Sequence, residues 1–419
     1  MTQTLSVWWD GAVVGALSVD RHGDMSFAYS KAWLDNPKHP AISMSLPKRE
    51  EPFSRRECRP FFEGLLPEES QREAAARALG VSRGNEFKLL NELGGEVAGA
   101  LTLWPEGEEP PAPQAKNQTQ PLSEKELIAI LDDLPVRPLL AGREGLRLSL
   151  AGAQSKLPVV IVDGAVALPA QGEATSHILK PPIDRFPGTT ENEAFGMRLA
   201  QKIGLSVASV EISQVQDRSF LLVERYDRRR GNEGRLYRLH QEDFCQALGF
   251  TSDHKYAAEG GPVFRDCFDL LRRAASRPAI EMLKLFDASI FNLIIGNADA
   301  HAKNFSLLYR EDGAIELAPL YDLLSTVYYP ALSPRLAMKI AKRHTLEEVK
   351  PGDWEKFAEE TGLGARYVKS RAAELTDAVV KATKPAAEEI AAVGHDQKSL
   401  GEIQSLVTNR AESLRQRLA

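Results

Sequence analysis

IIGNADAHAKNFSLL, residues 294–308, is the stretch that decides the fold of this 419-residue chain. An apolar helix is predicted to end at Gly296, and a polar loop then delivers Asp299 and Asn304 before an apolar strand begins. Short polar side chains often only cap turns, so neither residue alone is informative. The helix, the spaced polar pair and the strand together predict a catalytic loop carried by a helical lobe.

The spacing of Asp299 and Asn304 is typical of phosphoryl-transfer loops. Asp299 can orient a substrate hydroxyl and accept its proton, while Asn304 offers a neutral oxygen to Mg²⁺. Downstream, IELAPLYDLLS (315–325) is predicted to present Asp322 at the end of an apolar strand, where a carboxylate reaches the Mg²⁺ that bridges the ATP phosphates. We therefore predict Asp299 as the catalytic base, with Asn304 and Asp322 as metal ligands.

Other residues of these two segments are assigned to the ATP site. Lys303 is expected to meet the γ-phosphate, and Tyr321 lies next to the predicted metal ligand. His301 is also consistent with a hydrogen-bonding brace. The eight histidines form no HExxH pattern and the three cysteines lie far apart, so a zinc site is not supported.

The phosphate-binding parts are expected upstream. SLAGAQSK (149–156) is a small-residue turn whose N–H groups can approach phosphates, although it matches neither the GxGxxG nor the Walker pattern. Lys180 ends the strand-like run SHILK, and a buried lysine there needs an anionic partner such as ATP. Glu191 or Glu193 on the next helix is expected to hold this lysine, and spacing does not choose between them. Acids at a helix start also favour the helix dipole.

LLVERYD (221–227) is interpreted as the connection between two lobes, where backbone groups read the adenine edge; a solvated strand end is the alternative. The complete predicted ATP-binding set is Ala151, Gly152, Ala153, Gln154, Ser155, Lys156, Lys180, Glu224, Arg225, Tyr226, His301, Lys303, Asn304, Tyr321 and Asp322.

The chain divides around these motifs into three parts. Residues 1–145 are expected to start with a β-hairpin that turns at Asp10 and Gly11, to contain a helix at 67–80, and to end in a Pro-rich linker at 105–121. Residues 146–239 are predicted to form a small ATP-binding lobe and residues 240–419 a helical catalytic lobe. The fold class is therefore α+β, a two-lobed protein-kinase-like fold with an N-terminal mixed α/β subdomain.

Composition limits the function classes further. The chain is 43% hydrophobic and 26% charged, has no long apolar run, and starts without a signal-peptide pattern, so we expect a cytoplasmic protein without membrane contact. A net charge of −6 gives no general attraction to nucleic acid. The arginine-rich run at 225–238 is interpreted as a solvated hairpin in preference to a basic patch.

Taken together, these motifs resemble the HipA family, serine/threonine kinase toxins of bacterial toxin–antitoxin pairs. The six stretches SLAGAQSK, HILKPP, ENEAFGMRLA, VERYDR, GNADAHAKNFS and LAPLYDLLS occur in the family's order. FFEGLLPE (61–68) and GGEVAGAL (94–101) resemble its N-terminal subdomain. The resemblance spans nearly the whole chain and implies the base, metal and ATP roles assigned above.

The resemblance also implies properties that spacing does not show. Ser149 matches the family's autophosphorylated serine, whose modification ejects the phosphate loop and silences the kinase. The roughly 1.5 to 2 negative charges of a phosphate would be repelled by ATP. Ser155 stands where an acidic residue is commoner, which leaves a second phosphosite open.

The implied substrate is an aminoacyl-tRNA synthetase, glutamyl-tRNA synthetase or a relative, whose modification inhibits translation and growth and promotes persistence. The implied partner is a HipB-like helix-turn-helix antitoxin, through which the complex contacts operator DNA. Two alternatives stay open: a kinase-fold transcriptional co-regulator acting with a HipB-like repressor, and a small-molecule kinase. The intact catalytic series weighs against the first, and the N-terminal subdomain and Ser149 against the second.

Overall fold

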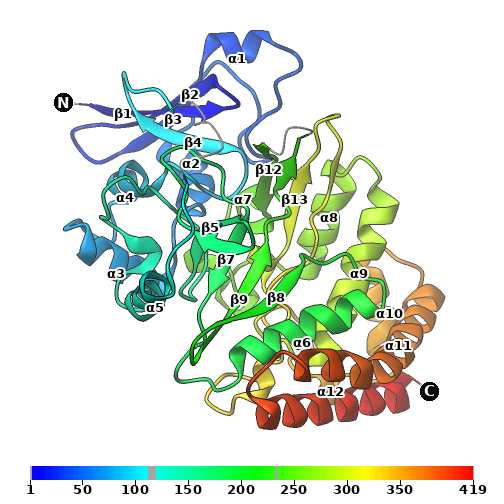
Figure 1. Ribbon diagram of the computed structural model, residues 1–419. Helices are drawn as coiled ribbons and strands as arrows, with labels where there is room; N and C mark the ends of the chain where they lie inside the picture. The colour runs from blue at the N-terminus through cyan, green and yellow to red at the C-terminus, as the bar shows by residue number, and fades with distance from the viewer. Residues whose placement is uncertain (1, 112–118, 232–234, 419) are drawn as a thin grey trace.

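The computed structural model describes residues 2–111, 119–231 and 235–418. Within these ranges, three large hydrophobic cores lie in an N-terminal subdomain, around a small sheet, and in a helical body (Figure 1). The first and last parts of the chain lie on opposite sides of the molecule in this view. The combination of mixed sheets and helices confirms the predicted α+β kinase-like class.

The N-terminal subdomain is built on an antiparallel sheet in the order β3-β2-β1-β4. Its first two strands form the predicted hairpin, because Asp10 and Gly11 adopt φ values of 46° and 77°. The predicted helix at 67–80 is also present, although it begins at Glu69. The elements are β1 (Gln3–Trp9), β2 (Ala12–Val19), β3 (Met25–Tyr29), β4 (Leu101–Pro105), α1 (Lys31–Asp35), α2 (Arg55–Glu63), α3 (Glu69–Ala78) and α4 (Glu86–Leu93).

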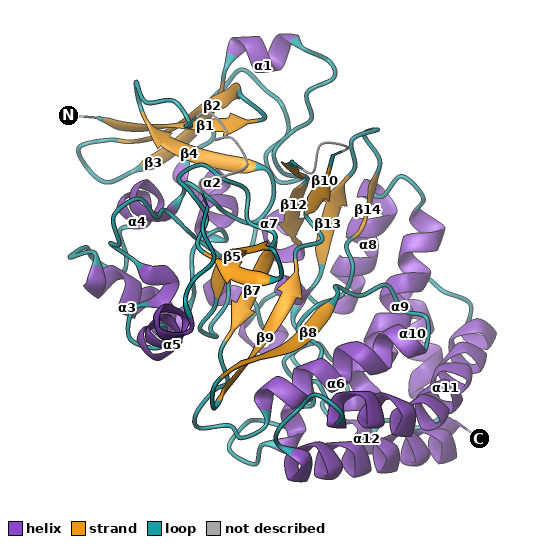
Figure 2. Cartoon of the chain, in the orientation of Figure 1, coloured by secondary structure: helices purple, strands orange, loops and turns teal. Residues whose placement is uncertain are grey.

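The small lobe is a five-stranded antiparallel sheet in the order β6-β5-β7-β9-β8 (Figure 2). Alternation along β9 sends Leu221 and Val223 into the core of the helical body, while Phe220 and Leu222 pack on the opposite face. The elements are β5 (Leu157–Val162), β6 (Ala165–Ala167), β7 (His177–Lys180), α6 (Thr189–Lys202), β8 (Val210–Val215) and β9 (Arg218–Glu224).

The face of this sheet away from the helical body is covered by α5 (Glu124–Asp133) and the 3-10 turn η1 (Pro138–Leu140). Leu127 and Leu131 of α5 share a core with Leu179 of β7. This helix precedes the predicted boundary at residue 145, so the small lobe draws on chain that the sequence assigned to the N-terminal part. Residues 112–118 of the predicted linker lie outside the described ranges.

The helical body contains the predicted apolar helix as α9 (Pro278–Ile295), and α11 and α12 run beside α6 and α9 (Figure 1). Its other helices are α7 (Phe244–Leu248), α8 (Phe264–Ala274), α10 (Asp353–Thr361), α11 (Ala365–Ala391) and α12 (Gln397–Leu418). Its strands are β12 (His240–Asp243), β13 (Ser306–Tyr309) and β14 (Ile315–Leu317). The 3-10 turns are η2 (Ser252–His254), η3 (Ala257–Glu259), η4 (Ala302–Asn304), η5 (Thr326–Tyr328) and η6 (Leu346–Glu348).

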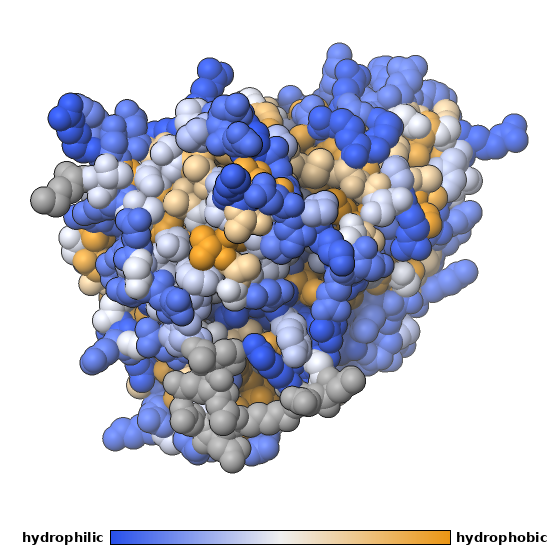
Figure 3. All heavy atoms as spheres, turned by 90° about the horizontal axis from the view of Figure 1, so that it is seen from above, coloured by the Kyte–Doolittle hydropathy of each residue, from blue (hydrophilic) through white to orange (hydrophobic). Residues whose placement is uncertain are grey.

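Among the helices of the described ranges, none is both long and apolar enough to pass through a bilayer. Figure 3 shows the face seen from above, where hydrophilic side chains cover most of the surface and apolar patches are small and scattered.

The arginine-rich run at 225–238 is not the fully solvated hairpin that the sequence predicted. Its strands β10 (Arg228–Arg230) and β11 (Leu236–Arg238) do pair, but residues 232–234 lie outside the described ranges. Glu96 of the N-terminal subdomain is buried against this run, 2.6 Å from Arg228, 3.2 Å from Arg225 and 2.6 Å from Arg238. Three guanidinium groups outweigh the burial of Glu96 and hold its pKa far below the usual value.

A second contact between the N-terminal subdomain and the helical body is made by Glu242 on β12. Its carboxyl group accepts hydrogen bonds from Ser43 Oγ at 2.5 Å, Met44 N–H at 3.0 Å and Tyr309 Oη at 2.5 Å. Burial nevertheless raises the pKa of Glu242 to about 7, because these three donors are neutral.

We predict that Glu242→Gln gains stability relative to wild type as the pH rises. The folded-state pKa of Glu242 is raised from 4.5 to about 7, so the stability it contributes is complete below the unfolded pKa and is lost as the pH rises through the folded one. Wild type should therefore lose up to about 3 kcal/mol between roughly pH 5 and pH 8 that the variant keeps. Urea unfolding at both pH values measures this, with the exposed Glu412→Gln as control; equal shifts in both variants would contradict it.

Candidate active site

Lys180 is buried at the end of β7, where the small sheet meets α6 and the loop that carries Asp322. Its ammonium lies 2.7 Å from Glu193 Oε1 and also contacts the Asp322 carboxylate. Glu191 faces elsewhere, because its Oε1 accepts the N–H groups of His395 at 3.0 Å and Asp396 at 3.2 Å. The structure thus pairs Lys180 with Glu193, the choice that the sequence left open.

Electrostatics favour the charged forms of the buried Lys180 and the half-buried Asp322, whereas burial raises the pKa of Glu193. Burial alone would lower the pKa of Lys180, but Asp322 and Glu193 outweigh it and raise the pKa. Burial alone would raise the pKa of Asp322, but Lys180 and then Lys156 hold it well below the usual value. The cluster therefore presents a carboxylate and two cationic side chains in one place.

Asp322 does not end a strand, contrary to the sequence prediction. β14 ends at Leu317, and the chain then leaves its strand partner because Leu320 instead exchanges backbone hydrogen bonds with Ser206 and Ala208 at 2.8 and 2.9 Å. Asp322 follows in a loop with φ 54°, a left-handed conformation that a non-glycine residue rarely adopts. The carboxylate is thus aimed by a constrained loop.

The predicted catalytic loop around Asp299 and Asn304 has the local structure expected from the sequence. Gly296 ends α9 in the left-handed conformation, with φ 74°, and an exposed Asp299 follows. Tyr256 donates a hydrogen bond from its hydroxyl to Asp299 Oδ1 at 2.8 Å. Asn304 donates from Nδ2 to the Asp299 backbone oxygen at 3.2 Å, which leaves its side-chain oxygen as the candidate metal ligand.

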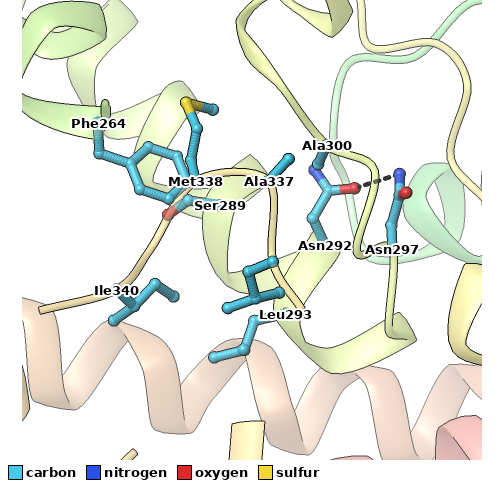
Figure 4. A pocket seen from close by; sticks show the side chains of 10 residues that line it. Phe264, Ser289, Asn292, Leu293, Asn297, Ala300, Ala337, Met338 and Ile340 are labelled. Carbon is cyan, nitrogen blue, oxygen red and sulfur yellow. Dashed lines mark hydrogen bonds between the residues drawn. The ribbon is translucent and has the colours of Figure 1, made fainter. Parts of the chain in front are cut away.

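Two asparagines that the sequence argument did not single out fix the loop around Asp322. The first, Asn297, donates from Nδ2 to Asn292 Oδ1 at 2.9 Å and to the Asp322 backbone oxygen at 3.0 Å. Figure 4 shows the side chains of Asn292 and Asn297 facing each other beside a small cavity. Asn192 on α6 bonds both backbone groups of Ser325, at 3.0 and 2.8 Å. Asn297 was detectable as the polar residue two positions before Asp299, whereas Asn192 looked like an ordinary helix residue.

The small-residue turn at 149–156 lies close to this cluster. Gly152 has φ 117°, and a Cβ there would lie 2.4 Å from Lys156 Nζ, which itself donates to the Ala151 oxygen at 2.8 Å. Glycine is therefore required. Burial and then the neighbouring Lys180 lower the pKa of Lys156, while Asp322 opposes them. Of the other turn residues, Ala153 is exposed and Gln154 donates to the Pro181 oxygen at 3.5 Å.

Ser149 is completely buried at the start of this turn. Its hydroxyl donates to the Leu65 oxygen at 2.7 Å, and its N–H donates to the Glu96 oxygen at 2.8 Å. Ser155 is half-buried and donates to Gln71 Oε1 at 3.2 Å. Neither hydroxyl faces solvent freely, so its modification requires this segment to move.

Some predicted ATP-site residues are engaged elsewhere in this structure. Lys303 Nζ lies 2.7 Å from Asp243 and 3.7 Å from Glu68. The N–H groups of Glu224 and Arg225 donate to the backbone oxygens of Ser209 and Ser176, just before β8 and β7, at 2.8 and 3.0 Å. The Arg225 side chain joins the Glu96 cluster, so an adenine contact from this segment would use other backbone groups.

The remaining predicted residues, Tyr226, Tyr321 and His301, pack near the predicted catalytic loop. Tyr226 and Tyr321 stack with ring centroids 5.8 Å apart, and Tyr321 donates to the Lys303 oxygen at 2.8 Å. His301 is buried, packs edge-on against Tyr256 at 5.2 Å, and has a pKa lowered by burial. Within the described residues the buried Nδ1 of His301 has no hydrogen-bond partner, so its contact with Tyr256 is one of packing and not the hydrogen-bonding brace that the sequence suggested.

The donor set is compatible with Mg²⁺. Asp322 supplies an ionised carboxylate and Asn304 an amide oxygen, both hard ligands. In the part of the chain that the structure describes, no group of three or more His, Cys, Asp or Glu residues is placed to hold a metal by itself. A magnesium ion here would therefore need phosphate oxygens or water to complete its octahedron, as it does in nucleotide sites.

A small antiparallel sheet with a buried lysine–glutamate pair, set against a helical lobe that carries Asp299 and Asp322, defines a protein-kinase-like fold. Family models match both parts of the chain: the HipA-like C-terminal domain over residues 148–383 and the HipA N-terminal domain over residues 5–104. The chain belongs to the HipA family.

Individual relatives agree with this. The chain is 58% identical over 99% of both chains to "Putative kinase Y4mE" of Sinorhizobium fredii. It is 33% identical, over 81% of its own length and 79% of the other, to the serine/threonine-protein kinase toxin HipA of Shewanella oneidensis. The solved complex of HipA, HipB and operator DNA from that organism contains a chain that matches over 99% of both chains, with a TM-score of 0.84 and 27% identity.

We predict that Asn297→Ala lowers the free energy of unfolding by about 1–3 kcal/mol, because it leaves the buried Asn292 and the Asp322 oxygen without their donor. Thermal and urea unfolding measure the loss, and the exposed Asn409→Ala on α12 is the control. Equal stability of the two variants would show that Asn297 does not hold the Asp322 loop.

Proposed function

We propose that this protein is a Mg-ATP-dependent serine/threonine-protein kinase that acts as the toxin of a toxin–antitoxin pair. The observation that carries the proposal is the buried contact of Lys180 with Glu193 and Asp322 beside the Asp299 loop. A lysine held in this way, with two cationic side chains and a carboxylate at one place, matches the charge pattern that a nucleotide phosphate chain with its metal requires.

In the proposed reaction, Asp299 accepts the hydroxyl proton of a substrate serine while the Oγ of that serine bonds to the γ-phosphorus of ATP. The bond from that phosphorus to the bridging oxygen breaks, which leaves ADP and phosphoserine. Because Tyr256 donates to Oδ1 of Asp299, Oδ2 is the oxygen that faces the substrate hydroxyl.

The other residues hold the nucleotide. Lys180 and Lys156 neutralise phosphate charge, and backbone groups of 224–226 contact the adenine. Mg²⁺, bound by Asn304 and Asp322, would neutralise the charge that develops on the phosphates. Kinase relatives support this use of ATP and a divalent metal.

The proposed partners follow from the relatives. The matching Shewanella oneidensis protein was solved with HipB and operator DNA. We therefore infer a HipB-like antitoxin for this chain, with DNA contacted mainly through that complex. As the substrate we propose an aminoacyl-tRNA synthetase in the cytoplasm, whose phosphorylation inhibits translation and growth and promotes persistence. A pure co-regulator would have no use for the charged cluster around Lys180.

The decisive experiment is to incubate the purified chain with Mg-ATP and map phosphate by mass spectrometry. Wild type should phosphorylate itself at Ser149, and Asp299→Asn should slow this by about 10²–10⁴-fold because the general base is lost. Ser149→Ala should remove that site and keep transfer to a protein substrate. Phosphate appearing on Ser149 equally fast in Asp299→Asn would refute the assigned base.

A second prediction separates the two helix acids. Glu193→Gln should lower kcat/KM for ATP by at least about tenfold, because Lys180 then pairs with Asp322 alone and withdraws it from the metal. Glu191→Gln, which changes the same charge on the same helix, should alter kcat/KM less than about threefold. Steady-state kinetics at varied ATP measures both, and equal losses would contradict the assignment.

A further inference from the structure

Glu68 of the N-terminal subdomain touches three parts of the kinase site. Its backbone N–H donates to the oxygen of Gly152 at 3.1 Å. Gly152 belongs to the small-residue turn at 149–156, which is the proposed phosphate loop. The Glu68 carboxylate lies 2.8 Å from Lys255 Nζ and 3.7 Å from Lys303 Nζ. Lys303 belongs to the catalytic loop, so one residue joins the phosphate loop to the catalytic loop.

The contact of Glu68 with Lys255 also links Glu68 to Asp299, the predicted base, through the residue that follows Lys255. Lys255 is 5% exposed, and the next residue, Tyr256, donates its hydroxyl to Asp299 Oδ1 at 2.8 Å. The position of Lys255 therefore sets the backbone from which Tyr256 reaches Asp299. The second lysine that Glu68 contacts, Lys303, immediately precedes Asn304, the candidate metal ligand.

The electrostatics make these contacts strong. Glu68 is 3% exposed, and burial alone would raise its pKa, but Lys303 and Lys255 outweigh it and lower the pKa to about 2. Both ammonium groups are also buried. Without the Glu68 charge, the ion pairs left among the described residues would be that of Lys303 with Asp243 and that of Lys255 with the exposed Glu69 at 2.9 Å. Removing one partner of a buried ion cluster is far more disruptive than removing an exposed pair.

Neighbouring residues extend the contact along the same segment. Leu65 accepts the hydroxyl of Ser149, and Gln71 accepts that of Ser155, at 2.7 and 3.2 Å. The N-terminal subdomain thus forms one wall of the phosphate loop, with Glu68 as the member of that wall that also reaches the catalytic loop.

We propose that Glu68 is a positioning residue through which the N-terminal subdomain holds the phosphate loop and the catalytic loop in register. The role in catalysis rests on the proposed kinase function, whereas the coupling of the two loops is testable without it. The subdomain is then part of the kinase machinery, and any movement of it changes both loops together.

Hydrogen–deuterium exchange of the full chain without nucleotide tests the coupling. Glu68→Gln should speed exchange by at least about tenfold in both 149–156 and 299–304, since the shared tie is loosened. The matched control is Glu73→Gln, an exposed acid on α3, the helix that begins immediately after Glu68; it should leave both segments unchanged. Unchanged exchange in Glu68→Gln, or a change confined to one loop, overturns the proposal.

A second variant and a kinase assay complete the test of Glu68. If Glu68→Gln fails to fold, Lys255→Gln removes the nearer of the two cations that hold the Glu68 carboxylate and should speed exchange in the same two segments; normal exchange there overturns the proposal. In the kinase assay, Glu68→Gln should lower kcat by at least about tenfold, and Glu68→Asp should recover part of the loss. A wild type without phosphoryl transfer would refute the proposed function, and the exchange data would still decide the role of Glu68.

Discussion

The structure depends on one buried ion contact, that of Lys180 with Glu193 and Asp322. A lysine inside a protein is tolerated only beside anions, so the strand, the helix and the loop that supply the three charges must meet at one point. This requirement brings the Asp322 loop to the junction of α6 and the small sheet, which also pack together through apolar side chains such as Phe195 and Leu221. Asn192 and Asn297 then hold that loop from both sides, and the same three elements frame the space that a nucleotide would need.

The N-terminal subdomain has an apolar core of its own, and buried charges are among the contacts that attach it to the rest of the molecule. Glu96 binds the arginines that follow β9, and Glu68 binds the lysines near the catalytic loop. A buried ion contact offsets the cost of desolvation only when its geometry is good and its remaining hydrogen bonds are satisfied. These contacts place residues of a separate subdomain beside loops of both lobes, and the subdomain and the lobes correspond to the two matched family models.

Local sequence rules predicted the elements well. The hairpin at Asp10 and Gly11 and the helix that ends at Gly296 follow from residues that occupy left-handed conformations readily. The rules did less well where distant segments compete. The strand expected to reach Asp322 stops at Leu317 because Leu320 pairs with Ser206 and Ala208. Two of the arginines expected in solvent, Arg225 and Arg228, are instead buried against Glu96. Tyr256 was invisible to the sequence argument because its partner Asp299 is far away along the chain.

The sequence by itself therefore determined the class: the spaced polar residues of the catalytic loop, the small-residue turn, the strand lysine and the ordered motifs of the HipA family are all local patterns. Only the tertiary structure decided which of two helix acids meets Lys180, how Ser149 is covered, and that Glu68 reaches both loops. The physical reason is the same in each case. Local patterns depend on backbone propensity within a few residues, whereas a buried charge selects its partner by position in three dimensions, after the whole chain has packed.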